Sequence, residues 1–167
     1  KEIDYRGVER VVRINGLDTP HWKEDIRVCV AGGADVIRIA KTESARDVHT
    51  VEEAVLAAEK EFGRPEGSTL LMAALESCRG VLRALEVCES SPRLIGIALS
   101  GGDYTKDLQT SISGTGVELM GARQQIVMAA RAAGVQCWDT VFTNLDDMEG
   151  FRKETQMIKI MGFDGKS

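Results

Sequence analysis

The stretch Leu70-Leu71-Met72-Ala73-Ala74-Leu75-Glu76-Ser77 decides the fold, because an apolar run ends abruptly at an acid. Residues 94–104, with the sequence LIGIALSGGDY, repeat this arrangement: the apolar run ends at Leu99, and Asp103 follows. Nearly continuous apolar runs are typical of parallel strands that are covered on both faces. The carboxyl ends of parallel strands meet at one edge of a sheet, so we expect Glu76 and Asp103 to share an edge.

Strand-like and helix-like segments alternate along the rest of the chain. The amphipathic period after Ser44 predicts one helix, and Thr115 with Glu118 predicts a capping box that opens another. Right-handed crossovers between such units make the strands parallel. The expected strands are Val8–Asn15, Ala34–Lys41, Leu70–Ser77, Leu94–Ser100 and Val135–Val141, with a sixth that begins near Phe163.

This repeat is compatible with two architectures, an open doubly wound sheet and part of a (β/α)8 barrel. A complete barrel typically takes about 250 residues, whereas this chain has 167. Length alone therefore favours the open sheet, in a single domain over residues 1–167. The chain ends at Asp164-Gly165-Lys166-Ser167 without a helix after the last strand, so we expect the sequence to stop in the middle of a unit.

The composition excludes several classes of function. The net charge is −5, which gives no basic surface for nucleic acid or anionic lipid. No apolar run approaches the roughly 20 residues of a membrane helix, and the charged start Lys1-Glu2-Ile3-Asp4 lacks the apolar core of a signal peptide. Cys29, Cys78, Cys88 and Cys137 have neither zinc nor CxxC spacing. We interpret them as reduced thiols of a cytoplasmic protein.

Polar side chains end the other strands as well. Arg13 lies near the end of the first, Lys41 ends the second and Asp139 lies near the end of the fifth. One edge would then carry one arginine, one lysine and two or three carboxylates, with Glu76 and Asp103 among them. Two carboxylates suit Mg2+, and an arginine binds a carboxylate bidentately, so the edge predicts a site for a small polyanion and a metal. Simpler interpretations stay open. Each acid could cap the helix that follows it, and each cation could be solvated at a strand end.

Ordered motifs along essentially the whole chain resemble the citrate lyase β group within the citrate-lyase-like, HpcH/HpaI-type aldolase family. The motifs come in the family's order and at matching spacings. The matching segments are Val11–Asp18, Gly32–Lys41, Gly67–Ser77, Leu94–Leu99, Asp103-Tyr104, Gly116–Leu119 and Gly162–Ser167.

The resemblance implies a TIM-barrel lyase, of which this chain would hold about strands three to seven and the beginning of strand eight. It implies that Glu76 and Asp103 bind Mg2+ and that Arg13 is catalytic, binding the acid substrate or its developing oxyanion. Lys41 and Asp139 are expected to bind substrate at the same edge. The implied reaction cleaves a citryl thioester on acyl carrier protein or CoA to oxaloacetate and an acetyl thioester. The implied partners are α and acyl-carrier γ subunits, with a homo-oligomer of three or more copies.

Two positions depart from the family pattern. Relatives often have proline where this chain has Ala40, and an acid where it has Gly102. Three alternatives stay open beside the citryl lyase. They are a lyase for a citramalyl or malyl thioester, a class II aldolase for a free 2-keto acid, and a noncatalytic scaffold or inactive fragment.

Overall fold

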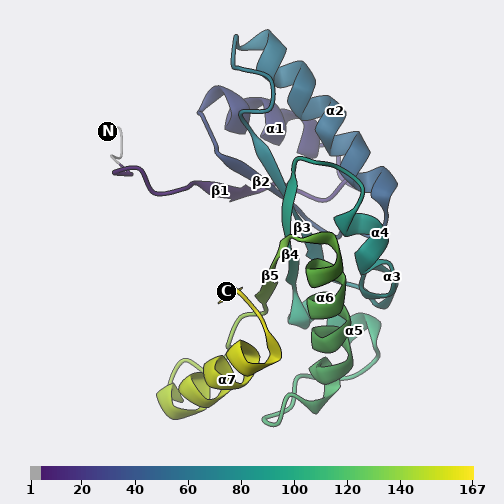
Figure 1. Ribbon diagram of the computed structural model, residues 1–167, viewed down its shortest axis with the longest axis vertical. Helices are drawn as coiled ribbons and strands as arrows, with labels where there is room; N and C mark the ends of the chain where they lie inside the picture. Colours follow the sequence, from purple (N-terminus) through teal and green to yellow (C-terminus); the bar gives the residue numbers. More distant parts are fainter. Residues whose placement is uncertain (1–4) are drawn as a thin grey trace.

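One curled parallel sheet forms the centre of the molecule. The computed structural model describes residues 5–167, so the charged start over residues 1–4 lies outside the described residues. Six strands are ordered β1-β2-β3-β4-β5-β6, and every pair is parallel. Figure 1 shows that the sheet curls with its helices on the convex side, as an open half-barrel. The strands are β1 Val11–Arg13, β2 Val36–Ile39, β3 Leu70–Leu75, β4 Leu94–Leu99, β5 Gln136–Asp139 and β6 Gly165–Lys166.

The strand order decides between the two expected architectures. A doubly wound sheet reverses direction at a switch point, so its first strand lies inside the sheet. Here each strand pairs with the next one in the chain, and the first lies at an edge. Repeated crossovers in one direction place the helices on one face and roll the sheet. The open doubly wound sheet that length favoured is therefore wrong, and the curled sheet agrees with the barrel-like alternative.

The helices cover the convex side of the sheet and make the main core with it. Side chains from β2, β3 and β4 alternate, so that Ile37, Leu71 and Ile97 pack toward the helices. A smaller cluster of Val36, Met72 and Ala98 lies on the other face. Within residues 5–167, no helix has the length and apolar character needed to cross a membrane. The helices are α1 Trp22–Ala31, α2 Ala45–Glu61, α3 Cys78–Leu82, α4 Ala84–Cys88, α5 Gly101–Asp107, the 3-10 helix η1 Val117–Leu119, α6 Met120–Ala133 and α7 Met148–Met161.

Two local expectations differ from the structure. The capping box of Thr115 and Glu118 is wrong: α6 begins at Met120, and the Glu118 carboxylate instead accepts hydrogen bonds from the backbone N and Oγ of Ser113. Helix α5 was not expected, because it begins with two glycines. Gly101 is required there, since a Cβ would lie 2.9 Å from the Oγ1 atom of Thr140.

A buried carboxylate stabilises the edge of the sheet at which the strands begin. Glu59, near the end of α2, is 1% exposed. It accepts hydrogen bonds from the backbone nitrogens of Gly67 and Thr69, at 3.0 and 2.8 Å, and from Nη1 of Arg93 at 2.9 Å. The carboxylate thus holds the loop before β3 and the residue before β4 at one point. Because its oxygens are satisfied inside the protein, Glu59 has a structural role.

We predict that Glu59→Gln lowers the free energy of unfolding of the full-length protein by about 3 kcal/mol, because the mostly buried Arg93 loses its closer carboxylate and keeps only Glu52, at 3.7 Å. Urea denaturation followed by circular dichroism measures the change. The control is Glu61→Gln, which breaks a pair with Arg27 whose side chains are both almost half exposed; it should cost less than about 1 kcal/mol. Equal losses in the two variants would contradict this account of Glu59.

Candidate functional site

Glu76 lies directly after β3 and has an unsatisfied buried oxygen. The residue is 7% exposed, and its Oε1 atom has no hydrogen-bond partner among the described residues. The next residue, Ser77, is the N-cap of α3, and its Oγ accepts a hydrogen bond from the backbone nitrogen of Gly80 at 3.1 Å. Capping is therefore done by the serine, and the Glu76 carboxylate is left for another partner.

Asp103 lies in the first turn of α5, next to the Glu76 carboxylate. Its Oδ1 atom accepts a hydrogen bond from Nζ of Lys106 at 2.9 Å, and both side chains are more than half exposed. That contact holds the pKa of Asp103 below its usual value, and contacts with Glu76 and the charge of Lys41 act in the same direction. Asp103 is therefore ionised at neutral pH, with Glu76 and Lys41 close to it.

The two carboxylates fit a hard divalent cation. Within residues 5–167 there is no group of three or more His, Cys, Asp or Glu side chains suited to a metal, so the donor set at this edge is a carboxylate pair. Mg2+ commonly takes one or two protein carboxylates and fills its other positions with water and substrate, whereas zinc sites use three or four protein ligands. The free Oε1 of Glu76 supplies an acceptor for such an ion. Gly102 leaves open space beside the pair, because a Cβ there would meet no atom within 4 Å.

Lys41 lies at a turn after β2. Its backbone is in the left-handed region, with φ of 51°, which is uncommon for a residue other than glycine. The Nζ atom is 3.6 Å from Oδ2 of Asp18, and both side chains are more than half exposed. The charge of Lys41 also reaches Asp103, and its role in substrate binding stays a prediction.

Arg13 and Arg38 lie side by side on β1 and β2. They are direct partners in the parallel register, and Arg13 is exposed while Arg38 is half-buried. Burial lowers the pKa of Arg38, the positive charge of Arg13 lowers it further, and Glu76 acts in the opposite direction. The Arg38 guanidinium therefore lies within electrostatic reach of both residues. Sequence reasoning missed Arg38, although an arginine inside the apolar run Val36–Ile39 is unusual enough to have been noticed.

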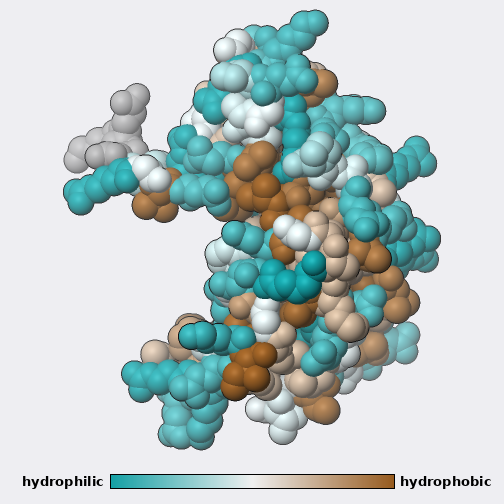
Figure 2. All heavy atoms as spheres, viewed as in Figure 1, coloured by the Kyte–Doolittle hydropathy of each residue, from teal (hydrophilic) through white to brown (hydrophobic). Residues whose placement is uncertain are grey.

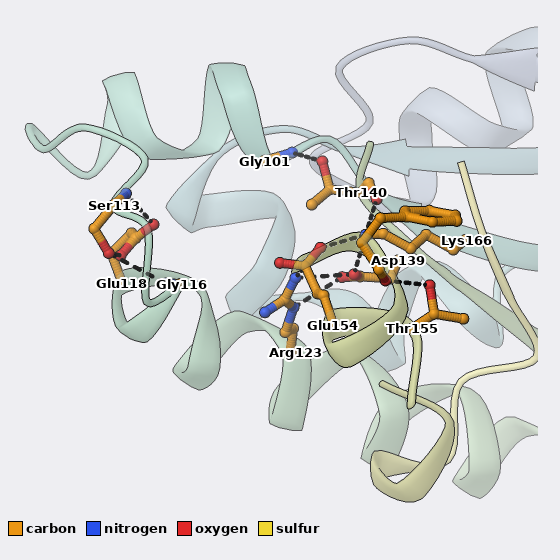
Figure 3. A network of polar contacts seen from close by, with 11 residues as sticks. Gly101, Ser113, Gly116, Glu118, Arg123, Asp139, Thr140, Glu154, Thr155 and Lys166 are labelled. Carbon is orange, nitrogen blue, oxygen red and sulfur yellow. Dashed lines mark hydrogen bonds and ion pairs between the residues drawn. The ribbon is translucent and has the colours of Figure 1, made fainter. Parts of the chain in front are cut away.

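Asp139 lies at the same edge but faces a buried ionic network (Figure 3). It is fully buried, and its two oxygens accept hydrogen bonds from Nε and Nη2 of Arg123, each at 2.9 Å. Nζ of Lys166 donates to the same carboxylate at 2.9 Å and also pairs with Glu154. The network therefore joins β5, α6, α7 and β6. Both Asp139 oxygens have protein partners, and its role in substrate binding stays a prediction.

We predict that Asp139→Asn lowers the free energy of unfolding by about 3 kcal/mol, because the fully buried Arg123 loses its bidentate partner and keeps only Glu154, at 3.3 Å. Denaturation of the full-length protein measures this, with Glu149→Gln as the control because its pair with Lys153 is fully on the surface of α7. A variant with unchanged stability and a raised KM would instead favour direct substrate binding by Asp139.

The half-barrel, with acids and cations gathered where its strands end, belongs to the class of α/β folds that place a catalytic site at this edge. The model of the HpcH/HpaI aldolase/citrate lyase family matches residues 1–167. The chain therefore belongs to that family.

Two named relatives match nearly all of the chain. The chain is 56% identical to the citrate lyase subunit beta of Leuconostoc mesenteroides subsp. cremoris over 99% of the chain and 55% of the relative. It is 33% identical to a (3S)-malyl-CoA thioesterase of Cereibacter sphaeroides over 98% of the chain and 53% of the relative. The chain thus spans about half the length of the curated relatives it matches.

A solved structure shares the fold. It is the citrate lyase beta subunit of M. tuberculosis complexed with oxaloacetate and magnesium, and it matches with a TM-score of 0.75 and 26% identity. The match covers 93% of this chain and 65% of that one.

Proposed function

We propose that the full-length protein is a Mg2+-dependent carbon–carbon lyase. It would cleave a citryl thioester, carried on acyl carrier protein or CoA, to oxaloacetate and an acetyl thioester. One observation carries the proposal: the adjacent carboxylates of Glu76 and Asp103 at the strand ends, with the buried Oε1 of Glu76 lacking a partner. The identity of 56% to a citrate lyase subunit beta and the oxaloacetate and magnesium in a related structure support the choice of substrate and metal.

Each residue at the edge has a proposed role. Glu76 and Asp103 hold Mg2+, which when bound supplies a Lewis acid for the oxygens of the substrate. Arg13 binds a substrate carboxylate or the developing oxyanion, because its guanidinium is exposed and forms no ion pair with a described residue. Lys41 adds positive charge beside the carboxylates. Asp139 keeps Arg123 and the end of β5 in place and would bind substrate only by giving up one of its partners.

The cleavage itself is the reverse of a Claisen condensation. Loss of the proton from the substrate hydroxyl lets its oxygen form the ketone of oxaloacetate while the adjacent carbon–carbon bond breaks. The bonding electrons move onto the thioester part as an enolate, which then takes up a proton. Fixed positive groups near these oxygens lower the barrier, because they stabilise charge as it develops.

We further propose that the chain forms one domain over residues 1–167 and corresponds to about strands three to seven and the beginning of strand eight of a complete barrel. Support comes from the sequential strand order and from the coverage of only about half of each curated relative. The proposed assembly contains α and acyl-carrier γ subunits and three or more copies of this protein. The 56% identity to a citrate lyase subunit beta supports that assembly.

We predict that Glu76→Gln and Asp103→Asn each reduce citryl thioester cleavage by the full-length protein more than about 100-fold at limiting Mg2+, because each removes a charged metal ligand. Oxaloacetate release measures the activity, which EDTA should abolish and added Mg2+ restore. Glu53→Gln, at an exposed position on α2, is the matched control and should keep full activity.

Full activity of both site variants at limiting Mg2+ would contradict the metal assignment. The relative that is a (3S)-malyl-CoA thioesterase supports a second candidate, an enzyme for malyl-type thioesters. Faster turnover of a malyl than of a citryl thioester by the wild-type protein would favour that candidate.

A further inference from the structure

Two arginines that form no ion pair with residues 5–167 share the inner face of the sheet. Arg13 and Arg38 are direct partners between β1 and β2, and Arg38 in turn partners Met72 on β3. Directly paired residues of neighbouring strands point to the same face, and Met72 belongs to the cluster on the face away from the main core. Residues alternate along a strand, so Glu76, four positions after Met72, follows on that same face.

The charge at this position is not balanced within the described part of the chain. Neither Arg13 nor Arg38 forms an ion pair with any residue from 5 to 167, and the Nε atom of Arg38 is buried without a hydrogen-bond partner. Glu76 is the carboxylate whose charge reaches Arg38. If Glu76 binds a metal ion, its negative charge is already compensated. A half-buried guanidinium beside another guanidinium is costly unless an anion arrives from outside the protein.

Two other buried arginines differ from Arg38 because each forms an ion pair, although Nη1 of Arg123 also lacks a hydrogen-bond partner among the described residues. Arg123 is fully buried and makes a bidentate pair with Asp139. Arg93 is mostly buried and pairs with Glu59. In both places the protein supplies the counter-ion where it buries the charge. Arg38 is half-buried within electrostatic reach of Glu76, and residues 5–167 supply no ion pair for it.

We propose that Arg38 is a specificity-determining residue that binds a second free carboxylate of the substrate. The proposal rests on the proposed function and deepens it. A citryl thioester carries two free carboxylates, whereas a malyl or citramalyl thioester carries one. Arg13 and the metal-binding edge accommodate the first carboxylate, and Arg38, on the neighbouring strand, receives the second. The guanidinium fork suits this task because it can donate two parallel hydrogen bonds to one carboxylate.

The products of the two kinds of reaction provide a direct test. Oxaloacetate has two carboxylates and pyruvate has one. The ratio of their affinities therefore measures how much the second carboxylate contributes to binding. Calorimetry with the full-length protein and saturating Mg2+ would measure the Kd of each keto acid. For Arg38→Gln we expect oxaloacetate to bind about 10- to 100-fold more weakly, the usual effect of losing a hydrogen bond to a charged group. Pyruvate should change by less than about 3-fold.

Two further variants complete the experiment. Arg46→Gln, at an exposed position on α2, is the control and should leave both affinities unchanged. Arg38→Lys keeps the charge but loses the fork, so the preference for oxaloacetate over pyruvate should fall about 5-fold or more. The lysine variant decides the question if circular dichroism shows that Arg38→Gln does not fold.

Equal weakening of both keto acids, or an unchanged ratio in Arg38→Gln and Arg38→Lys, would overturn the assignment of Arg38. That result is distinguishable from failure of the proposed function. A wild-type protein that releases no oxaloacetate from a citryl thioester contradicts the function itself. A wild-type protein that does so, with an affinity ratio insensitive to Arg38, contradicts the arginine assignment alone.

Discussion

The parallel pairing of β3 with β4 is the constraint on which the site depends. The last residues of the two strands, Leu75 and Leu99, are direct partners. Both strands therefore end at the same level of the sheet. Glu76 follows one strand immediately, and Asp103 follows the other within the first turn of α5. Neither acid could approach the other if the register moved by a few residues. The apolar side chains on the two faces fix that register, because a shift by one residue would turn each strand over.

The buried charged side chains of this fold are of two kinds: some have partners inside the protein, and others do not. Glu59 and Asp139 each accept several hydrogen bonds from fixed donors, and both tie neighbouring elements together. The oxygens of these two carboxylates already have protein partners. Glu76 and Arg38 are the contrast: each has a buried polar atom without a partner, and neither forms an ion pair with a residue from 5 to 167, whereas Arg123, which also has such an atom, is ion-paired. Unsatisfied buried atoms are costly, so their presence at one edge is a physical argument for a ligand there.

Much of the fold could be predicted from the sequence, because long periodic segments dominate it. The strand over Leu70–Leu75 and the helix after Ser44 are confirmed. The predicted strands were too long at their ends, because they included flanking polar residues such as Lys41, Glu76-Ser77 and Ser100, which lie outside the observed strands. Helix α5 was missed because glycine is a poor helix former. Its start depends on the packing of Gly101 against Thr140, which lies far away in the sequence.

The site was only partly predictable for a related reason. The acids at strand ends could be named because the end of a strand is visible in the sequence. The orientation of Arg38 follows from the register of β2 against its two neighbours, which no single segment specifies. The satisfied state of Asp139 depends on Arg123 and Lys166, two residues from separate elements. Roles that depend on partners distant in the sequence required the structure.

In the proposed site, Glu76 and Asp103 together bind one divalent cation. Electron paramagnetic resonance of Mn2+, used in place of Mg2+ with the full-length protein, measures the number of bound ions directly. We expect one bound ion per chain in the wild-type protein, displaced by Mg2+, and loss of that site in either Glu76→Gln or Asp103→Asn. An unchanged number of bound ions and unchanged affinity in both variants would contradict the account.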